Sequence, residues 1–315
     1  MARDTVIGKI DELDRLLIDE LQKDSRQSAR DIARKVDITP ITAHRRINRL
    51  FEIKAVRPMV IINPGAVGFE TRAFFGMTIQ PGAIDSVVER LEPLWNIQSI
   101  VTTAGPFDLF ILTVFRNQQE LAGFICEELG KIPELVSAED MPIMSVMKSF
   151  WKSESPMGKG GVTDEVVPRN LDDLEASLIR ELEKSPRDTV ANLGRKLNVS
   201  RKVVARKLAH LKRDHILDVV GMINPEVLGY GTQATILLKA PPTRINAIAE
   251  KLVGYERVQH MLVLSGQYRM LVSTLFHDIA DLHDFVRTEI RSIPGIIGYE
   301  IIINLSFHKA SSYLG

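Results

Sequence analysis

Apolar residues recur at helical spacing near the start of the chain. Leucines within 11–23 line one face and predict an amphipathic helix, and a shorter apolar face predicts a second helix over 28–36. Thr39 suits an N-cap and Pro40 suits a first helical turn, so a third helix begins there after a tight turn. A β-rich stretch, Val56–Ile62, follows. Helix, helix, turn, helix and a strand pair together predict a winged helix-turn-helix.

The pattern then changes to short strands alternating with helices. After Gly68 the order β-α-β-β-α-β predicts a ferredoxin-like sandwich. Such a sheet leaves one face open, and the neighbouring apolar residues of FILTVF at 110–115 indicate burial on both faces. We therefore expect the open face to pack against that of a second such domain, within this chain or in another chain. The predicted strands are 71–79, 97–104, 107–115 and 135–148, and the predicted helices are 83–94 and 118–130.

The whole pattern occurs twice. Shifting the sequence by 161 positions places Asp11 on Asp172, Gly105 on Gly266 and Lys148 on Lys309. A register kept over about 140 residues without a gap indicates two copies of one two-part module. Copy two therefore has its expected elements at 172–184, 189–197, 201–213 and Leu217–Ile223, followed by a second β-α-β-β-α-β segment from Gln233–Leu238 to Tyr299–Phe307.

These patterns predict an α+β protein of two repeats, each a winged helix-turn-helix followed by a ferredoxin-like domain. The segment between the copies is rich in Gly, Ser, Pro and Glu and has no apolar periodicity, as is typical of a flexible linker. The expected boundaries are 9–63 and 170–224 for the helix-turn-helix domains, 68–150 and 229–310 for the ferredoxin-like domains, and 151–169 for the linker.

Composition excludes several classes of protein. Hydrophobic residues make up 45% of the 315 residues and charged residues 25%, as in ordinary globular chains. Cys126 is the one cysteine, which excludes a disulfide framework, a cysteine-based zinc site and an iron–sulfur cluster, and the histidines lie at unrelated spacings. No apolar run approaches the roughly 20 residues of a membrane span, and the acidic N-terminus has no apolar signal core. We therefore expect a cytoplasmic protein without membrane contact, metal or cofactor.

Charge is balanced overall but unevenly distributed. Forty basic and forty acidic residues give zero net charge, yet 26–57 and 187–218 each hold nine basic and three acidic side chains, a net +6 apiece. The stretch 58–148 is net −6. Cations gathered on both helix-turn-helix regions of a neutral chain are the pattern expected for binding the phosphate backbone of double-stranded DNA.

The third helix of each copy carries the candidate DNA contacts. Its basic residues either solvate an exposed face or reach DNA, and their recurrence after a cap residue in both copies favours DNA. Residues in the first turns are placed to meet base edges, and those further along to hold phosphates. The candidates are Thr39, Ile41, Thr42, His44, Arg45, Arg46 and Arg49 in copy one, and Ser200, Arg201, Lys202, Arg206, Lys207, Lys212 and Arg213 in copy two.

A glycine-containing turn joins the two central strands of each ferredoxin-like domain. Glycine permits the positive φ that a tight connection requires, so the turn has a purely structural explanation. The alternative is a small-molecule site at the interface of the paired domains, where side chains reach an amino or carboxylate group. The candidate effector residues are Gly105, Phe107 and Asp108 in copy one and Gly266, Tyr268 and Arg269 in copy two.

Several motifs together carry a family resemblance. They are LDRLLIDELQKDSRQSARDIARKVDIT, RRINRL, INPGAVGF with INPEVLGY, AGPFDLF and EELGKIP. The chain resembles two fused copies of the Lrp/AsnC family of transcription factors, over nearly everything except the linker and the extreme termini. The resemblance implies a sequence-specific DNA-binding regulator that forms homo-oligomers and binds a small effector, such as an amino acid, near the glycine turn.

The sequence departs from the family pattern at two positions, and its two third helices differ from each other. Pro106 stiffens the first turn, and Arg269 stands where the family's aspartate is expected. If copy one binds an amino-acid-like ligand, we expect copy two to bind a different ligand or none. Pro40-Ile41 in one third helix against Arg201-Lys202 in the other indicates two non-identical half-sites.

An enzymatic alternative has the same architecture. The chain also resembles the sirohaem decarboxylases, which use histidines of the α/β domain on a tetrapyrrole. His260 lies about where such a histidine is expected, but copy one has Ser99 there and no further histidine follows in the next turn. No phosphate loop, nucleophile elbow or paired-carboxylate motif occurs, so we expect no enzyme. A third alternative, an interaction protein that has lost DNA binding, disagrees with the +6 charge of both modules.

Overall fold

The computed structural model describes residues 10–148 and 168–310. They form two compact units, each with contributions from both copies of the repeat. We call residues 10–63 and 171–230 the helical unit, and residues 64–148, 168–170 and 231–310 the barrel unit.

Copy one gives the helical unit three helices and one strand. They are α1 (Glu12–Lys23), α2 (Ala29–Lys35), α3 (Pro40–Glu52) and β1 (Val56–Ile62). A polar side chain caps each helix, from Asp11, Ser28 and Thr39 respectively, and so accepts a hydrogen bond from a backbone N–H that the first turn leaves unpaired. Apolar side chains of the three helices form one core in which Leu17, Leu21, Ile32, Ile47 and Leu50 are buried.

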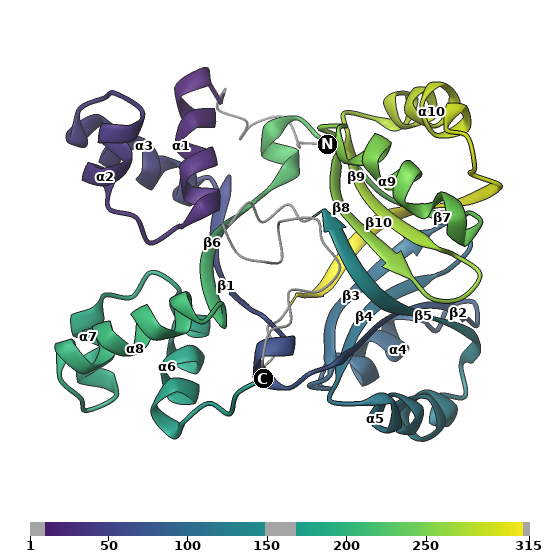
Figure 1. Cartoon of the computed structure of the whole chain (residues 1–315), viewed down its shortest axis with the longest axis horizontal. Coiled ribbons are helices and arrows are strands. Elements are labelled where there is room, and N and C mark those ends of the chain that lie inside the picture. Colours follow the sequence, from purple (N-terminus) through teal and green to yellow (C-terminus); the bar gives the residue numbers. More distant parts are fainter. Residues whose placement is uncertain (1–9, 149–167, 311–315) are drawn as a thin grey trace. The chain divides into compact units, whose positions relative to one another are not determined.

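Copy two repeats this arrangement residue for residue. It supplies α6 (Asp173–Lys184), α7 (Val190–Lys196), α8 (Arg201–Arg213) and β6 (Leu217–Ile223), whose bounds are those of copy one moved by 161 positions. The helix-turn-helix predicted for each copy is therefore confirmed, and Figure 1 shows the two helical modules with β1 and β6 between them.

The sequence predicts a strand pair within each module. This prediction is wrong, because the strands of the two modules pair with each other. Strand β1 pairs antiparallel with β6 of the other copy, from Val56 opposite Ile223 to Ile62 opposite Leu217. Each strand is followed by an Asn-Pro step instead of a hairpin turn, so its nearest available partner is its own repeat. Gly221 permits the close approach, because a Cβ there would lie 2.6 Å from Val56 Cγ1 and 2.8 Å from the Leu21 carbonyl oxygen.

The barrel unit contains the β-α-β-β-α-β order twice, as predicted. Copy one supplies β2 (Thr71–Ile79), α4 (Ile84–Leu91), β3 (Ile97–Ala104), β4 (Leu109–Phe115), α5 (Gln118–Gly123) and β5 (Leu135–Lys148). Copy two supplies β7 (Thr232–Lys239), α9 (Ile245–Val253), β8 (Val258–Leu264), β9 (Met270–Phe276), α10 (Ile279–Thr288) and β10 (Gly298–Ala310). The helix expected over 118–130 is less regular, because α5 continues through π-helical and 3₁₀ turns as far as Lys131.

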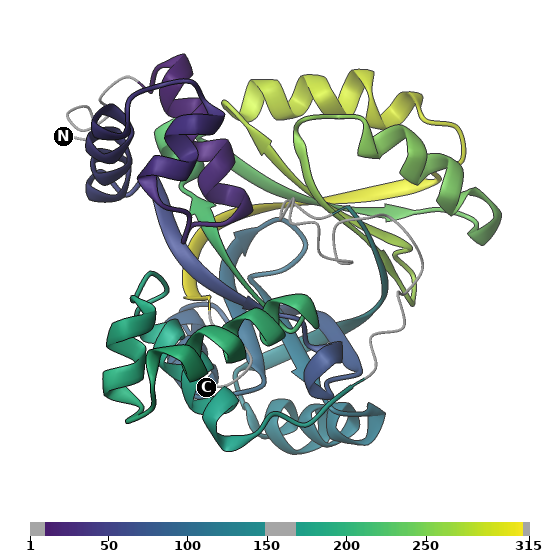
Figure 2. The same ribbon diagram turned by 60° about the vertical axis from the view of Figure 1, so that its left-hand side comes forward.

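The eight strands close into one barrel, in the order β10-β3-β4-β2-β5-β8-β9-β7. The copies join where β5 pairs with β8 and where β10 pairs with β3, and the helices cover the outside (Figures 1 and 2). A buried apolar cluster with Phe107, Phe110, Tyr268 and Leu271 draws on both copies. The open sheet faces are thus buried within the chain. Edge strands of the two sheets also pair with each other, which the sequence did not predict.

Three sequence expectations concern the linker, membrane spans and metal sites. Residues 151–167 of the expected linker lie outside the described residues. Among the helices that are described, none is long and apolar enough to cross a membrane. Within 10–148 and 168–310, no group of three or more His, Cys, Asp or Glu side chains is arranged to hold a metal ion.

Candidate nucleic-acid interface and glycine turns

The first turns of α3 present an exposed surface. The Thr39 hydroxyl caps the helix by accepting a hydrogen bond from Thr42 N at 3.2 Å. The Ile41 side chain is 83% exposed, which is unusual for a large apolar residue at the start of a helix. His44 and Arg45 are exposed one turn later, so the predicted base-reading residues of copy one lie together on one accessible surface.

The start of α8 is built in the same way with different side chains. The Ser200 hydroxyl accepts a hydrogen bond from Val203 N at 3.3 Å. Arg201, Lys202 and Arg206 are exposed, and none of them forms an ion pair with another described residue. Copy two therefore offers three cationic side chains where copy one offers Arg45 and an exposed isoleucine.

Arg46 and Arg49 of α3 have partners inside the protein. Arg46 Nη1 lies 2.6 Å from Asp11 Oδ2 and 2.9 Å from Asp14 Oδ1, and Arg49 Nη1 lies 3.0 Å from Asp14 Oδ2. Asp14 is fully buried. The hydrogen bonds to these carboxylates raise the pKa of Arg46, and the hydrogen bond from the Asp14 backbone, with that from Arg46, lowers the pKa of Asp11.

Lys207 of α8 makes the equivalent contacts in copy two. Its ammonium pairs with Asp172 and lies 3.3 Å from Glu175 Oε1. The hydrogen bond to Asp172 raises the pKa of Lys207, and the same bond lowers the pKa of Asp172. The acidic partners in both copies are the two members of a capping box at the start of the first helix.

The remaining predicted phosphate contacts also have partners. Lys212 Nζ lies 2.5 Å from Asp24 Oδ2, and Arg213 Nη2 lies 2.9 Å from Asp214 Oδ1. Of the predicted contacts, Arg45, Arg201, Lys202 and Arg206 are the cations without an ion pair to a described residue. The +6 charge of each module thus overstates the number of cations available to a ligand. The capping boxes place two carboxylates at the start of each first helix and are visible in the sequence, but their pairing with the third helix is not.

The glycine turn of copy one is tightly packed. Gly105 has φ of +136°, and a Cβ there would lie 2.4 Å from the Ile301 carbonyl oxygen of β10. The Asp108 carboxylate accepts a hydrogen bond from Ile79 N at 2.8 Å, and the Phe107 ring lies over Gly76. These contacts give the turn a structural role, whether or not it also binds a ligand.

The turn of copy two is different. Gly266 has φ of +108°, but a Cβ there would meet nothing within 4 Å. Burial raises the pKa of Tyr268 to about 12, and Lys239 Nζ lies 5.0 Å from the centroid of its ring. Phe107 and Tyr268 belong to one buried cluster, while Arg269 is partly exposed, so the structure brings together the two predicted aromatic residues.

Family models match most of the described chain. The AsnC-type helix-turn-helix domain matches residues 10–50, and the Lrp/AsnC ligand binding domain matches residues 72–150 and 233–314. The chain belongs to the Lrp/AsnC family. The two matches to the ligand-binding domain fall in the two copies of the ferredoxin-like domain, so this Lrp/AsnC protein is duplicated.

Two relatives of this Lrp/AsnC chain are about as long as one copy of the repeat. It is 33% identical over 141 residues to an HTH-type transcriptional regulator of Pyrococcus abyssi, over 44% of this chain and 89% of the relative. It is 29% identical over 140 residues to the HTH-type transcriptional regulator FL11 of the same organism, over 44% of this chain and 92% of FL11. Each relative therefore corresponds to about one copy of the repeat.

A solved structure matches both copies at once. The siroheme decarboxylase NirDL superposes with a TM-score of 0.67 and 14% identity, over 96% of this chain and 94% of NirDL. At this identity the likeness shows a shared tandem fold. In this Lrp/AsnC chain, burial lowers the pKa of His260 to about 4, and the positive charges of Arg72 and Lys148 contribute to the shift.

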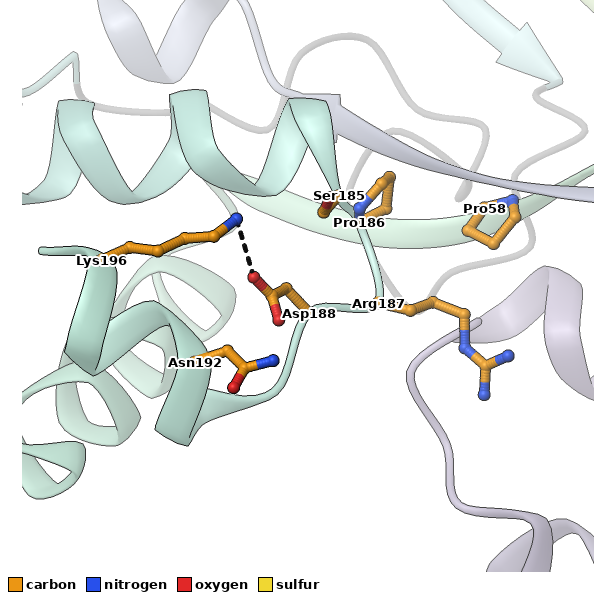
Figure 3. A pocket seen from close by; sticks show the side chains of 7 residues that line it. All are labelled: Pro58, Ser185, Pro186, Arg187, Asp188, Asn192 and Lys196. Carbon is orange, nitrogen blue, oxygen red and sulfur yellow. Dashed lines mark ion pairs between the residues drawn. The ribbon is translucent and has the colours of Figure 1, made fainter.

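A surface hollow of about 550 Å³ lies in the helical unit (Figure 3). Lys196 Nζ lies 3.0 Å from Asp188 Oδ2 at its edge, so these charges compensate each other. Arg187 points away from them, and its guanidinium carbon lies 4.4 Å from the centroid of the Phe51 ring. The hollow therefore marks a contact between the two modules and offers no convergent set of unpaired polar groups. Its lining is Pro58, Ser185, Pro186, Arg187, Asp188, Asn192 and Lys196.

Proposed function

We propose that this chain is a sequence-specific DNA-binding transcription regulator that reads duplex DNA with α3 and α8. The observation that carries the proposal is the pair Arg45 and Arg206. They occupy equivalent positions in the two copies, both are exposed, and neither has an ion pair with a described residue. Their neighbours Arg46 and Lys207 are instead held by carboxylates. A duplicated, accessible arginine on a capped helix is suited to base edges or phosphates.

Binding of fluorescent duplexes across a salt series tests this proposal. We expect affinity on the order of nanomolar for a selected site, falling steeply as salt increases. The double variant R45A/R206A should bind at least about tenfold more weakly. The control variant R90A/R287A removes the same charge from exposed positions on α4 and α10 of the barrel unit and should bind like the wild type. Equal affinity of both variants would reject the assignment of the helices.

We also propose that the barrel unit binds a small, amino-acid-like effector near the glycine turns. Membership of the Lrp/AsnC ligand binding domain supports a ligand. Arg269 supplies a partly exposed guanidinium that suits a carboxylate, while the Asp108 carboxylate already accepts a backbone hydrogen bond. Thermal unfolding against a panel of amino acids tests this, and R269A should reduce any stabilisation found. No shift with any amino acid would contradict the effector proposal.

We propose further that the chain acts in the cytoplasm as a homo-oligomer and catalyses no reaction. The enzymatic alternative is a sirohaem-decarboxylase-like activity, for which the likeness to NirDL supplies the fold alone. Incubation with the tetrapyrrole substrate, followed by mass analysis, distinguishes the two functions, since decarboxylation removes carbon dioxide and a regulator leaves the mass unchanged. Light scattering in solution gives the number of chains.

A further inference from the structure

The two DNA-reading modules are joined into one body. Strands β1 and β6 pair over seven residues each. Ser25 N donates to the Val219 carbonyl oxygen at 2.9 Å, which connects copy one to the strand of copy two. Arg26 donates to the carbonyl oxygens of Pro186 and Asp188, at 2.8 Å and 2.7 Å. One chain therefore holds both recognition helices without a second chain.

The side-chain contacts of this interface are not reciprocal. Arg187 is the equivalent of Arg26, yet it lies over the Phe51 ring instead of donating to carbonyl groups of the other copy. Lys212 is the equivalent of Phe51, and it pairs with Asp24. Pro186 stands where copy one has Ser25 and has no N–H to donate. The two modules therefore make different side-chain contacts across their interface.

The two reading surfaces share an exposed arginine and differ at other positions, among them the second helical position. Arg45 and Arg206 are common to both copies and exposed. At the second helical position, α3 has Ile41, which is 83% exposed, and α8 has Lys202. An apolar side chain in the major groove contacts the methyl group of thymine, whereas lysine and arginine donate to O6 and N7 of guanine.

We propose that one chain binds an asymmetric operator made of two unlike half-sites. Both half-sites contain the base contacted by Arg45 or Arg206. The half-site under α3 has thymine at the position of Ile41, and the half-site under α8 has guanine at the position of Lys202, with Arg201 adding a second cationic contact. This inference rests on the proposed function, since it concerns the same two helices.

Selection from a library of randomised duplexes tests the asymmetry. The wild type should enrich two unlike half-sites at fixed spacing. The variant P40R/I41K gives α3 the first two residues of α8, at exposed positions, and should enrich guanine in both half-sites. The reverse variant R201P/K202I should enrich thymine in both, because proline is well tolerated at the first helical position. Circular dichroism and thermal unfolding establish that each variant is folded. The bases enriched by one folded variant are sufficient to test the inference.

Equilibrium binding then compares three duplexes of equal length: the asymmetric operator and two palindromes, each built from one half-site. The wild type should bind the asymmetric duplex at least about fivefold more tightly than either palindrome. Enrichment of a palindrome by the wild type, or equal affinity for all three duplexes, overturns the inference while leaving the proposed function intact. Failure to enrich any duplex overturns the proposed function itself.

Discussion

Arg46 Nη1 lies 2.9 Å from Oδ1 of Asp14, a carboxylate with no solvent exposure. The same relationship recurs between Lys207 and Glu175, at 3.3 Å, with the Glu175 side chain 3% exposed. In each copy a cation of the third helix is thereby tied to the start of the first. Two adjacent basic residues of each third helix therefore have different roles. One stabilises the module, and the other is exposed to solvent.

Alanine substitution should separate these two roles. R46A removes a partner of the buried Asp14 carboxylate and should lower the free energy of unfolding by about 1–2 kcal/mol, with Arg49 limiting the loss. R45A removes an exposed side chain and should leave stability unchanged while weakening DNA binding. Chemical denaturation and duplex binding on both variants measure the two effects. Loss of stability in R45A, or none in R46A, would contradict this division.

Much of the fold follows from local patterns. Helix starts are marked by side chains that hydrogen-bond three residues away, such as Thr39 to Thr42 and Ser200 to Val203. Apolar periodicity and the internal repeat then set the remaining bounds, so the element bounds of the helical unit agree closely with prediction. The repeat also predicted that the glycine turns occupy equivalent positions.

Contacts between distant residues were not predictable in this way. Arg46 and Asp14 are separated by 32 positions and Arg26 and Pro186 by 160, and no local pattern relates them. The partner of β1 was missed for the same reason, because a strand's sequence specifies its two faces better than its neighbour. Charge counting likewise counted Arg46, Arg49, Lys207 and Lys212 as free, although their partners lie in other helices or loops.

The glycine turns offer a matched pair of substitutions. In G105A the new methyl group meets the Ile301 carbonyl oxygen at 2.4 Å in addition to backbone strain, so unfolding should become easier by more than about 2 kcal/mol. In G266A the Cβ enters open space, and backbone strain alone should cost about 1–2 kcal/mol. Thermal unfolding of both variants compares them. Equal destabilisation would mean that the close approach of β10 to the first turn is absent in solution.

Glu183 of α6 should make stability depend on pH. Its Oε1 atom is buried without a hydrogen-bond partner among the described residues, and burial raises the pKa of Glu183 to about 7. Between pH about 4.5, where the unfolded side chain ionises, and about 7, the folded state binds more protons than the unfolded state. Stability due to this group therefore falls as pH rises through that window, and the full penalty remains above it.

The variant E183Q should remove this dependence, since copy one carries Gln22 at the equivalent position. Because Glu183 is partly exposed, solvent screening reduces the gain at pH 8 to about 1 kcal/mol, or about 2–4 °C in melting temperature. The control E181Q should be less stable than the wild type at pH 8, because hydrogen bonds from Lys184 and Lys196 lower the pKa of Glu181. A gain in both variants would point to a general effect of reduced negative charge on α6.

His260 should remain neutral throughout the physiological range. Burial, with the charges of Arg72 and Lys148, lowers its pKa to about 4, against about 6.5 for the unfolded chain. Between these values the unfolded state binds more protons, so the contribution of His260 to stability is complete above pH about 6.5 and is lost as pH falls toward 4. H260S places the residue of copy one, Ser99, at this position and should flatten the acid limb of a melting-temperature profile.

The titration of His260 can also be followed directly by NMR. The imidazole resonance that disappears in H260S should not move between pH 5.5 and 8 in the wild type. A midpoint inside that range would show that the imidazole is solvated. Because His260 lies in the barrel unit, H260S should bind the operator as tightly as the wild type.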